Sequence, residues 1–405
     1  MGPRAVAFVA GLAWCAGPAT LVAQNRDWST LPTGRIIERV TSPSDTTEHY
    51  ALYLPRAYPA GRTWPVLVLL DPRGRALVPL ERVRASAERL GYLVVSSYNT
   101  ASDGPAAPNE RAFQAILRDL LPRLAIDRRR FYFAGMSGTA RQAWEFAYRL
   151  PGTAAGVIGF SAGLPVSLDS LVAIYGEQPR FAFFGGAGRL DFNYQELRAL
   201  DATLDHAGTA HRVVFYAGPH GWPPASVFDA ALTWLEWEAV REGWSSADST
   251  ALESAYAAAL DSAHARDTRT PLASDVRAEM DRLGKEEAAY RRRVFETAGA
   301  IRRAAHRDDP APWLERLQVA KLLRVAGATD TLAAEAAYRE LALAFTEFSF
   351  YESRTLESAG DDARALLVLQ IADGIRPGTP QVCARIAALA RRLGRDVACR
   401  APTPS

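Results

Sequence analysis

Short β-rich segments alternate with amphipathic helical segments between about residue 45 and residue 243, and this alternation most constrains the fold. In the helical segments, such as ERAFQAILRDLLPRL, apolar residues recur at intervals of three and four. Such alternation is typical of a mostly parallel sheet with helices on both faces. The segments with strand character are HYALYLP from 49, WPVLVLLD from 64, YLVVSSYN from 92, RFYFAGMS from 130, AAGVIGFS from 154, RFAFFGGAG from 180 and HRVVFYAG from 211. The sequence therefore predicts a doubly wound α/β domain over 45–243.

The composition changes at about residue 244. Ala, Arg, Leu and Glu dominate from there on with helical periodicity, so a smaller all-α domain is predicted over 244–405. Gly327, Gly360 and Gly394 recur at spacings of 33 and 34 residues, each between two apolar helical stretches. This period resembles that of tetratricopeptide helix pairs, although the large aromatic residue expected early in each repeat is absent. The alternative is an irregular helical bundle that packs on the sheet domain.

The N-terminal segment has the pattern of a secretory signal peptide. Residues 1–23 contain Arg4, then an apolar run, then small residues around a cleavage site after Ala23. Residues 24–44 would form a lead segment before the sheet domain. We therefore expect an exported protein, periplasmic or secreted, with no membrane association after cleavage. The alternative is a retained membrane anchor, against which the glycines and the proline that interrupt the run argue.

Charge and cysteine content exclude several classes of function. The 47 Lys and Arg residues nearly balance the 45 Asp and Glu residues, giving a net charge of +2, so nucleic-acid binding is not expected. The six histidines and three cysteines lack the spacing of metal ligands, and we expect neither a metal nor any other cofactor. Beyond the signal segment, Cys383 and Cys399 remain, and an exported protein with two cysteines favours a disulfide, although the sequence leaves their pairing open.

Two serines compete for the role of nucleophile, Ser137 in GMSGT and Ser161 in GFSAG. A serine nucleophile must be exposed, near a base and near N–H donors, and a tight strand-to-helix turn supplies these conditions. Ser137 follows a strand and precedes a good helix, whereas Ser161 is followed by AGLPVS, which favours a loop. We therefore predict that Ser137 is the nucleophile, although Thr139 stands where the motif usually has a glycine.

Three segments together resemble one known family. YFAGMSGTAR, GGAGRLDFNYQE and YAGPHGWPP look like the nucleophile elbow, acid loop and histidine loop of α/β-hydrolases, and are similar to those of an exported esterase branch that includes feruloyl esterases and polyhydroxyalkanoate depolymerases. The resemblance covers residues 45–243. It implies a catalytic triad of Ser137, Asp191 and His220, in the chain order of the family. The alternative for Asp191 is a helix cap without a catalytic duty.

The resemblance also implies an oxyanion hole and a substrate pocket. The N–H of Gly138 would join that of Arg73 or of Gly74, which the sequence does not separate, and Gly74 alternatively serves only a turn. Residues beside the predicted strand ends or loops that could line an apolar pocket, or could equally belong to the core, are Tyr98, Met136 and Trp222.

The function that follows is that of a serine hydrolase. The expected substrate is a carboxylic ester, either a small molecule or a polymer, cleaved through an acyl-enzyme intermediate. One alternative is a serine peptidase of the same fold. The other is an inactive hydrolase-fold protein that binds a protein partner through its C-terminal helices.

Overall fold

The computed structural model describes residues 30–59, 61–304, 309–328 and 331–401. The segment predicted to be a signal peptide, 1–23, lies outside the described residues. Within the described ranges, no helix combines the length and apolar character needed to cross a membrane.

The sheet domain is built on one mixed sheet whose nine strands run in the order β1-β2-β4-β3-β5-β6-β7-β8-β9. Adjacent strands from β4 through β3 to β8 are parallel, whereas β1, β2 and β9 pair antiparallel with their neighbours. The strands are β1 (Ile36–Thr41), β2 (His49–Tyr53), β3 (Trp64–Leu70), β4 (Leu93–Ser97), β5 (Ile126–Met136), β6 (Ala154–Phe160), β7 (Ala182–Gly188), β8 (His211–Tyr216) and β9 (Arg266–Asp267). The predicted mostly parallel sheet of the α/β-hydrolase type is confirmed.

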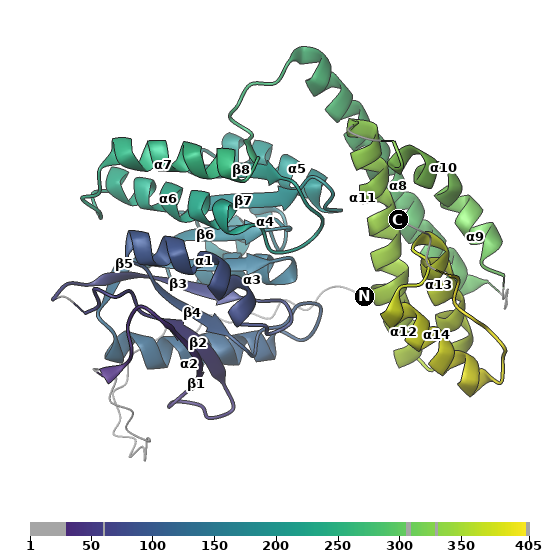
Figure 1. Cartoon of the computed structure of the whole chain (residues 1–405), viewed down its shortest axis with the longest axis horizontal. Helices are drawn as coiled ribbons and strands as arrows, with labels where there is room; N and C mark the ends of the chain where they lie inside the picture. Colours follow the sequence, from purple (N-terminus) through teal and green to yellow (C-terminus); the bar gives the residue numbers. More distant parts are fainter. Residues whose placement is uncertain (1–29, 60, 305–308, 329–330, 402–405) are drawn as a thin grey trace.

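Helices cover both faces of the sheet and bury two separate apolar cores (Figure 1). On one face lie α1 (Leu77–Leu90), α6 (Ala225–Arg241) and α7 (Ser249–Ser262). On the other lie α2 (Ala107–Arg123), α3 (Gly138–Tyr148), α4 (Leu168–Tyr175) and α5 (Tyr194–His206). Since every residue of β3 is buried, its central position explains why WPVLVLL has no polar alternation.

The sheet domain extends beyond residue 243, where the composition places its end. Helix α7 packs through Ala259 and Ala263 into the same core as α6, and β9 then pairs with the edge of β8, with Asp267 opposite Val214. The boundary prediction was therefore too early. Helix α7 has the alanine-rich composition of the following region, and a two-residue strand has no periodicity, so neither carries a signal that assigns it to the sheet.

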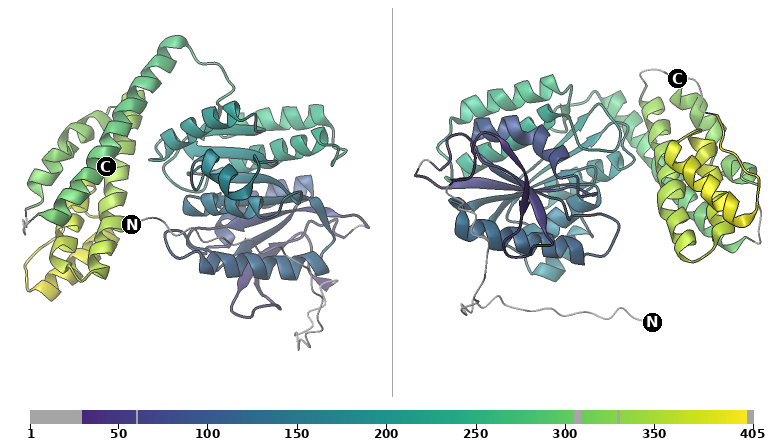
Figure 2. Two further views of the ribbon diagram at one scale, coloured as in Figure 1. Left: turned by 180° about the vertical axis from the view of Figure 1, so that it is seen from behind. Right: turned by 60° about the horizontal axis from the view of Figure 1, so that its bottom comes forward.

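The remaining helices form a second unit beside the sheet domain (Figure 2), which we call the helical region. Its elements are α8 (Ser274–Arg303), α9 (Ala311–Arg316), α10 (Val319–Ala326), α11 (Leu332–Thr346), the π-helical turn η2 (Glu347–Glu352), α12 (Ser353–Ser358), α13 (Asp362–Ile375) and α14 (Pro380–Leu393). They enclose a core of their own around α13. Gly360 and Gly394 follow helix ends with φ of 76° and 63°, where a glycine is favoured. The tetratricopeptide likeness stays a prediction.

A disulfide joins Cys383 in α14 to Cys399 in the C-terminal segment, which settles the pairing that the sequence leaves open. It closes a loop with a sequence separation of 16 residues. We expect replacement of both cysteines by serine to lower the free energy of unfolding by about 3 kcal/mol, because the unfolded chain regains the entropy of the open loop. Thermal melting of the oxidised protein and of the double variant measures this loss. Equal melting temperatures would contradict the prediction.

Candidate active site

Ser137 occupies a tight turn between β5 and α3. Its backbone has φ of 57° and ψ of −131°, a conformation that is costly for a residue with a side chain and that recurs at functional sites. The Ser137 N–H donates to the carbonyl of Phe160 at the end of the neighbouring strand (2.8 Å), which fixes the turn. Ser137 is the N-cap of α3, so the N–H of Gly138 belongs to the first turn of that helix and points away from any intrahelical acceptor. The turn therefore presents a part-exposed hydroxyl beside a helix N-terminus.

Two neighbours of Ser137 explain how this turn tolerates Thr139. A Cβ added to Gly135 would lie 2.2 Å from the carbonyl oxygen of Thr139, so the first glycine of the motif is needed for close packing. Thr139 is itself fully buried, and its hydroxyl donates to the carbonyl of Leu70 (2.5 Å) and accepts from the N–H of Met136 (3.2 Å). The threonine thus ties the start of α3 to the end of β3 by hydrogen bonds.

Ser161 shares the strained conformation of Ser137 but not its exposure. Its φ is 61°, yet the residue is 0% exposed and a loop follows it rather than a helix. Its hydroxyl donates to the carbonyl of Gly221 (3.3 Å), and its carbonyl accepts from the side-chain amide of Asn193 (2.8 Å). Ser161 therefore holds together the loops that follow β7 and β8.

Asp191 and His220 meet above the ends of these two strands. The Oδ1 atom of Asp191 lies 2.9 Å from Nδ1 of His220 and also accepts from the main-chain N–H of Asn193 (2.8 Å). Asp191 is 0% exposed, whereas His220 is part-exposed. The N–H of Leu190 donates to the carbonyl of Gly218 (3.0 Å), which joins the two loops through their main chains. The carboxylate is therefore buried behind the imidazole.

Ser137 is connected to this pair through β6. Within the described residues no hydrogen bond joins the Ser137 hydroxyl to His220. The turn at Ser137 is bonded to the last residue of β6, and Ser161, the next residue along the chain, is bonded to Gly221 beside His220. The carboxyl ends of parallel neighbouring strands lie on one sheet edge, so all three predicted triad residues share that edge.

The turn after β3, which contains Arg73 and Gly74, is organised by Asp71. This buried carboxylate accepts from the N–H of Arg73 (2.8 Å) and from the indole N–H of Trp222 (2.7 Å). The N–H of Gly74 donates to the carbonyl of Asp71 (3.2 Å). Burial raises the pKa of Asp71, but hydrogen bonds, chiefly from Arg75, outweigh burial and hold this pKa below its usual range. Both candidate oxyanion donors are thus already engaged within the turn.

Gly74 has a clear steric reason to be glycine. Its φ is 63°, and an added Cβ would lie 2.2 Å from the carbonyl oxygen of Tyr98. This close approach supports the alternative that Gly74 serves the turn.

The three candidate pocket residues lie in different surroundings. Met136 and Trp222 are 7% and 8% exposed and belong to the core on the α6 face of the sheet. Tyr98 is half-buried, and its hydroxyl donates to the carbonyl of Glu38 (2.7 Å). The burial of Met136 and Trp222 favours the alternative that these two are core residues.

Several residues that organise this edge carry only weak sequence signals. Asp71 stands before Pro-Arg-Gly and could be identified as a turn former, but its bond to Trp222 spans 151 positions. The ring of Phe192 stacks on that of His220, with centroids 4.3 Å apart and planes 23° apart. Asn193 shows no feature that separates it from an ordinary loop residue.

Metal-ligand geometry is limited to one place in the described part of the chain. Asp373 lies beside Cys383 and Cys399, and the two sulfur atoms are already joined in the disulfide. This group lies in the helical region, whereas the proposed triad residues follow strands of the sheet.

Neither a family model nor a curated protein matches this chain. Among solved structures it is similar to a substrate-bound fluorophosphonate-binding serine hydrolase of Staphylococcus aureus, with 14% identity, a TM-score of 0.41, and coverage of 50% of this chain and 99% of the other. It is similar to a ferulic acid esterase, with 18% identity, a TM-score of 0.38, and coverage of 50% and 96%. It is also similar to the S-formylglutathione hydrolase of Staphylococcus aureus, with 15% identity, a TM-score of 0.39, and coverage of 51% and 98%. These values are too low to transfer site residues, so the roles below are argued from this chain's own geometry.

Proposed function

We propose that the protein is a serine hydrolase that cleaves carboxylic esters through an acyl-enzyme intermediate. The observation that carries this proposal is the hydrogen bond between buried Asp191 and part-exposed His220, on the sheet edge that also bears the Ser137 turn. A buried carboxylate on Nδ1 fixes the imidazole so that Nε2 is available as a base, and it stabilises the imidazolium that forms. An ordinary surface turn would need neither arrangement.

In the proposed reaction, His220 removes the proton from the Ser137 hydroxyl as the oxygen attacks the ester carbonyl carbon. The tetrahedral oxyanion accepts a hydrogen bond from the N–H of Gly138. The second donor, Arg73 or Gly74, would have to be shared with Asp71. His220 then donates the proton to the departing alkoxide, which leaves as the alcohol. Water, deprotonated by His220, attacks the acyl-enzyme, and the carboxylic acid leaves with Ser137 restored.

Labelling by a fluorophosphonate probe tests the proposal, because this reagent phosphonylates an activated serine. We expect wild type and Ser161→Ala to be labelled and Ser137→Ala to remain unlabelled, with the modified peptide identified by mass spectrometry. Absence of labelling in the folded wild type would refute the proposal and favour a non-catalytic interaction protein. Labelling at Ser161 would assign the wrong nucleophile.

Substrate preference and location form a finer part of the proposal. We propose esters rather than peptides, with a small-molecule or polymeric acyl ester as substrate. Turnover of short acyl esters without cleavage of matched amides would support this choice. The disulfide supports an exported protein, since such bonds persist outside the reducing cytosol.

A further inference from the structure

Two arginines of the helical region donate to the main chain on either side of Asp191. The guanidinium of Arg339 in α11 donates to the carbonyl of Arg189 (2.7 Å). That of Arg291 in α8 donates to the carbonyl of Phe192 (2.7 Å). The four-residue segment that contains Asp191 is therefore held at both ends by residues from outside the sheet domain. We call residues 189–195 the acid loop.

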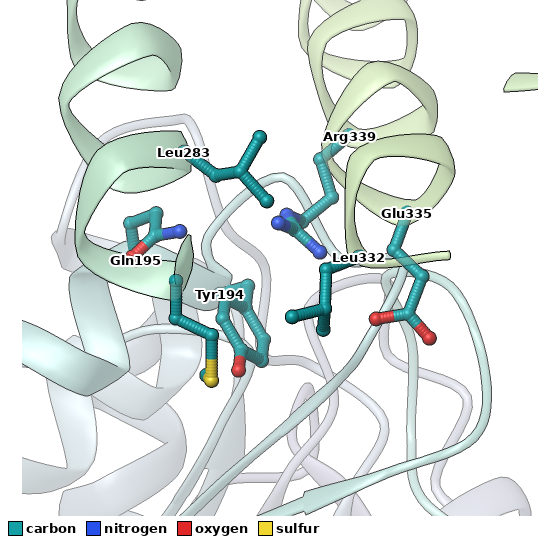
Figure 3. A pocket seen from close by; sticks show the side chains of 7 residues that line it. Tyr194, Gln195, Leu283, Leu332, Glu335 and Arg339 are labelled. Carbon is teal, nitrogen blue, oxygen red and sulfur yellow. The ribbon is translucent and has the colours of Figure 1, made fainter. Parts of the chain in front are cut away.

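Arg339 is rigidly oriented for this contact. It is 4% exposed and forms two hydrogen bonds with Glu287 of α8 (2.5 and 2.9 Å). Its guanidinium also lies 4.5 Å from the centre of the Tyr194 ring in the acid loop. Figure 3 shows this guanidinium between the helices of the helical region and Tyr194, at a small crevice with an empty volume of 220 Å³. A bidentate, buried arginine of this kind fixes the groups it contacts.

Further side chains of the acid loop contact the same helices. The side chain of Arg189 pairs with Glu335 (3.0 Å), and Glu287 accepts from the amide of Gln195 (2.9 Å). Burial, opposed by the charge of Glu196, lowers the pKa of the Arg291 guanidinium, which is near enough to Asp191 to feel its charge.

Phe192 links the helical region to the proposed general base. Its ring packs against the core of the helical region on one side and stacks on the imidazole of His220 on the other. A shift of the helices would therefore move both the carboxylate and the ring of the Asp191–His220 pair.

The helical region also reaches the opposite side of the Ser137 turn. The hydroxyl of Tyr351, in η2, donates to the carboxylate of Asp103 (3.1 Å), whose other oxygen accepts from Ser102 (2.7 Å). A Cβ added to Gly138 would lie only 2.6 Å from that of Ser102, so this loop abuts the proposed oxyanion donor. Contacts on two sides of the site argue against a flexibly attached partner module.

We propose that the helical region is a fixed part of the active site and that Arg291 and Arg339 are positioning residues, which hold the acid loop so that Asp191 orients His220. This inference rests on the proposed function. It follows from the geometry because a displacement of about 1 Å at a distant support can reduce a rate by about a hundredfold. The bonds to the two carbonyls act on the loop directly, whereas a purely adhesive interface could form at any other surface.

Arg291 is the better position for a test. Loss of Arg339 would leave Glu287 buried without its partner, which destabilises strongly and obscures any effect on catalysis. Arg291→Ala removes the donor to Phe192, and Arg291→Lys keeps a positive donor. Asp281→Ala is a matched control, since it breaks another contact between the two units, with Arg198 (2.9 Å), without touching the acid loop.

The experiment measures kcat and KM on a short ester together with the rate of fluorophosphonate labelling and the melting temperature. We expect Arg291→Ala to lower kcat and the labelling rate about 10- to 100-fold with little change in KM, Arg291→Lys to recover part of that loss, and Asp281→Ala to match wild type. A wild-type rate for Arg291→Ala, or equal losses in Arg291→Ala and Asp281→Ala, would overturn the inference alone. A folded wild type that resists labelling would overturn the proposed function with it.

Discussion

Ser137→Ala is expected to lower kcat/KM for a short acyl ester by about ten-thousand-fold or more, without lowering the melting temperature. The substitution removes the attacking oxygen, and the remaining groups can only bind the ester and polarise its carbonyl. The Ser137 side chain is not a partner in any hydrogen bond between described residues, and its main-chain bond to Phe160 is kept by alanine. Steady-state kinetics and thermal melting on the same preparation measure both effects.

Ser161→Ala is the matched control for this prediction, since both serines have positive φ and each follows a strand of the same sheet. It removes one hydrogen bond to Gly221 beside His220, so a loss of at most about tenfold is expected. A larger loss in Ser161→Ala than in Ser137→Ala would exchange the two roles.

The choice between the two serines could be made from the sequence because local patterns decided it. A helix-forming segment after Ser137 and Pro165 after Ser161 are nearest-neighbour signals, and the structure has the helix and the loop in these places. The same patterns did not reveal that Ser161 bonds the histidine loop. That contact joins residues 60 positions apart, and no periodicity encodes it.

The layout of the sheet was likewise predictable, whereas its edges were not. Strands buried on both faces, such as β3 and β6, carry a continuous apolar signal. The short strand β9 belongs to the sheet only because it pairs with β8, and β1 falls within the segment expected to precede the domain. Both are edge strands, where the pairing partner rather than the local sequence decides the structure.

The support around the proposed triad depends on distant residues, which is why the sequence could not supply it. Arg291 and Arg339 are two among many arginines, and nothing in their own segments distinguishes them. They become informative only when the fold brings α8 and α11 beside the loop after β7. The helical region therefore looks like a separate module in the sequence and like part of the site in the structure.

Asp191→Asn is expected to lower kcat/KM by about a thousand- to ten-thousand-fold while the melting temperature stays equal or rises. Because the N–H of Asn193 needs an acceptor at the Oδ1 position, the carbonyl oxygen of the new asparagine remains there and can still accept from His220. The variant therefore loses the negative charge that stabilises the imidazolium, rather than the orientation of the ring.

The predicted stability follows from the other carboxylate oxygen. Asp191 Oδ2 is buried and has no hydrogen-bond partner within the described residues, and burying a neutral amide costs less than burying a charge. Asparagine also caps a turn as well as aspartate does, so a purely structural Asp191 would leave both activity and stability unchanged on this substitution. Kinetics on a short ester together with thermal melting therefore distinguish the two roles. Near wild-type turnover in the folded variant would make Asp191 a turn former, because opposite changes in activity and stability are expected only when a buried charge is kept for the reaction.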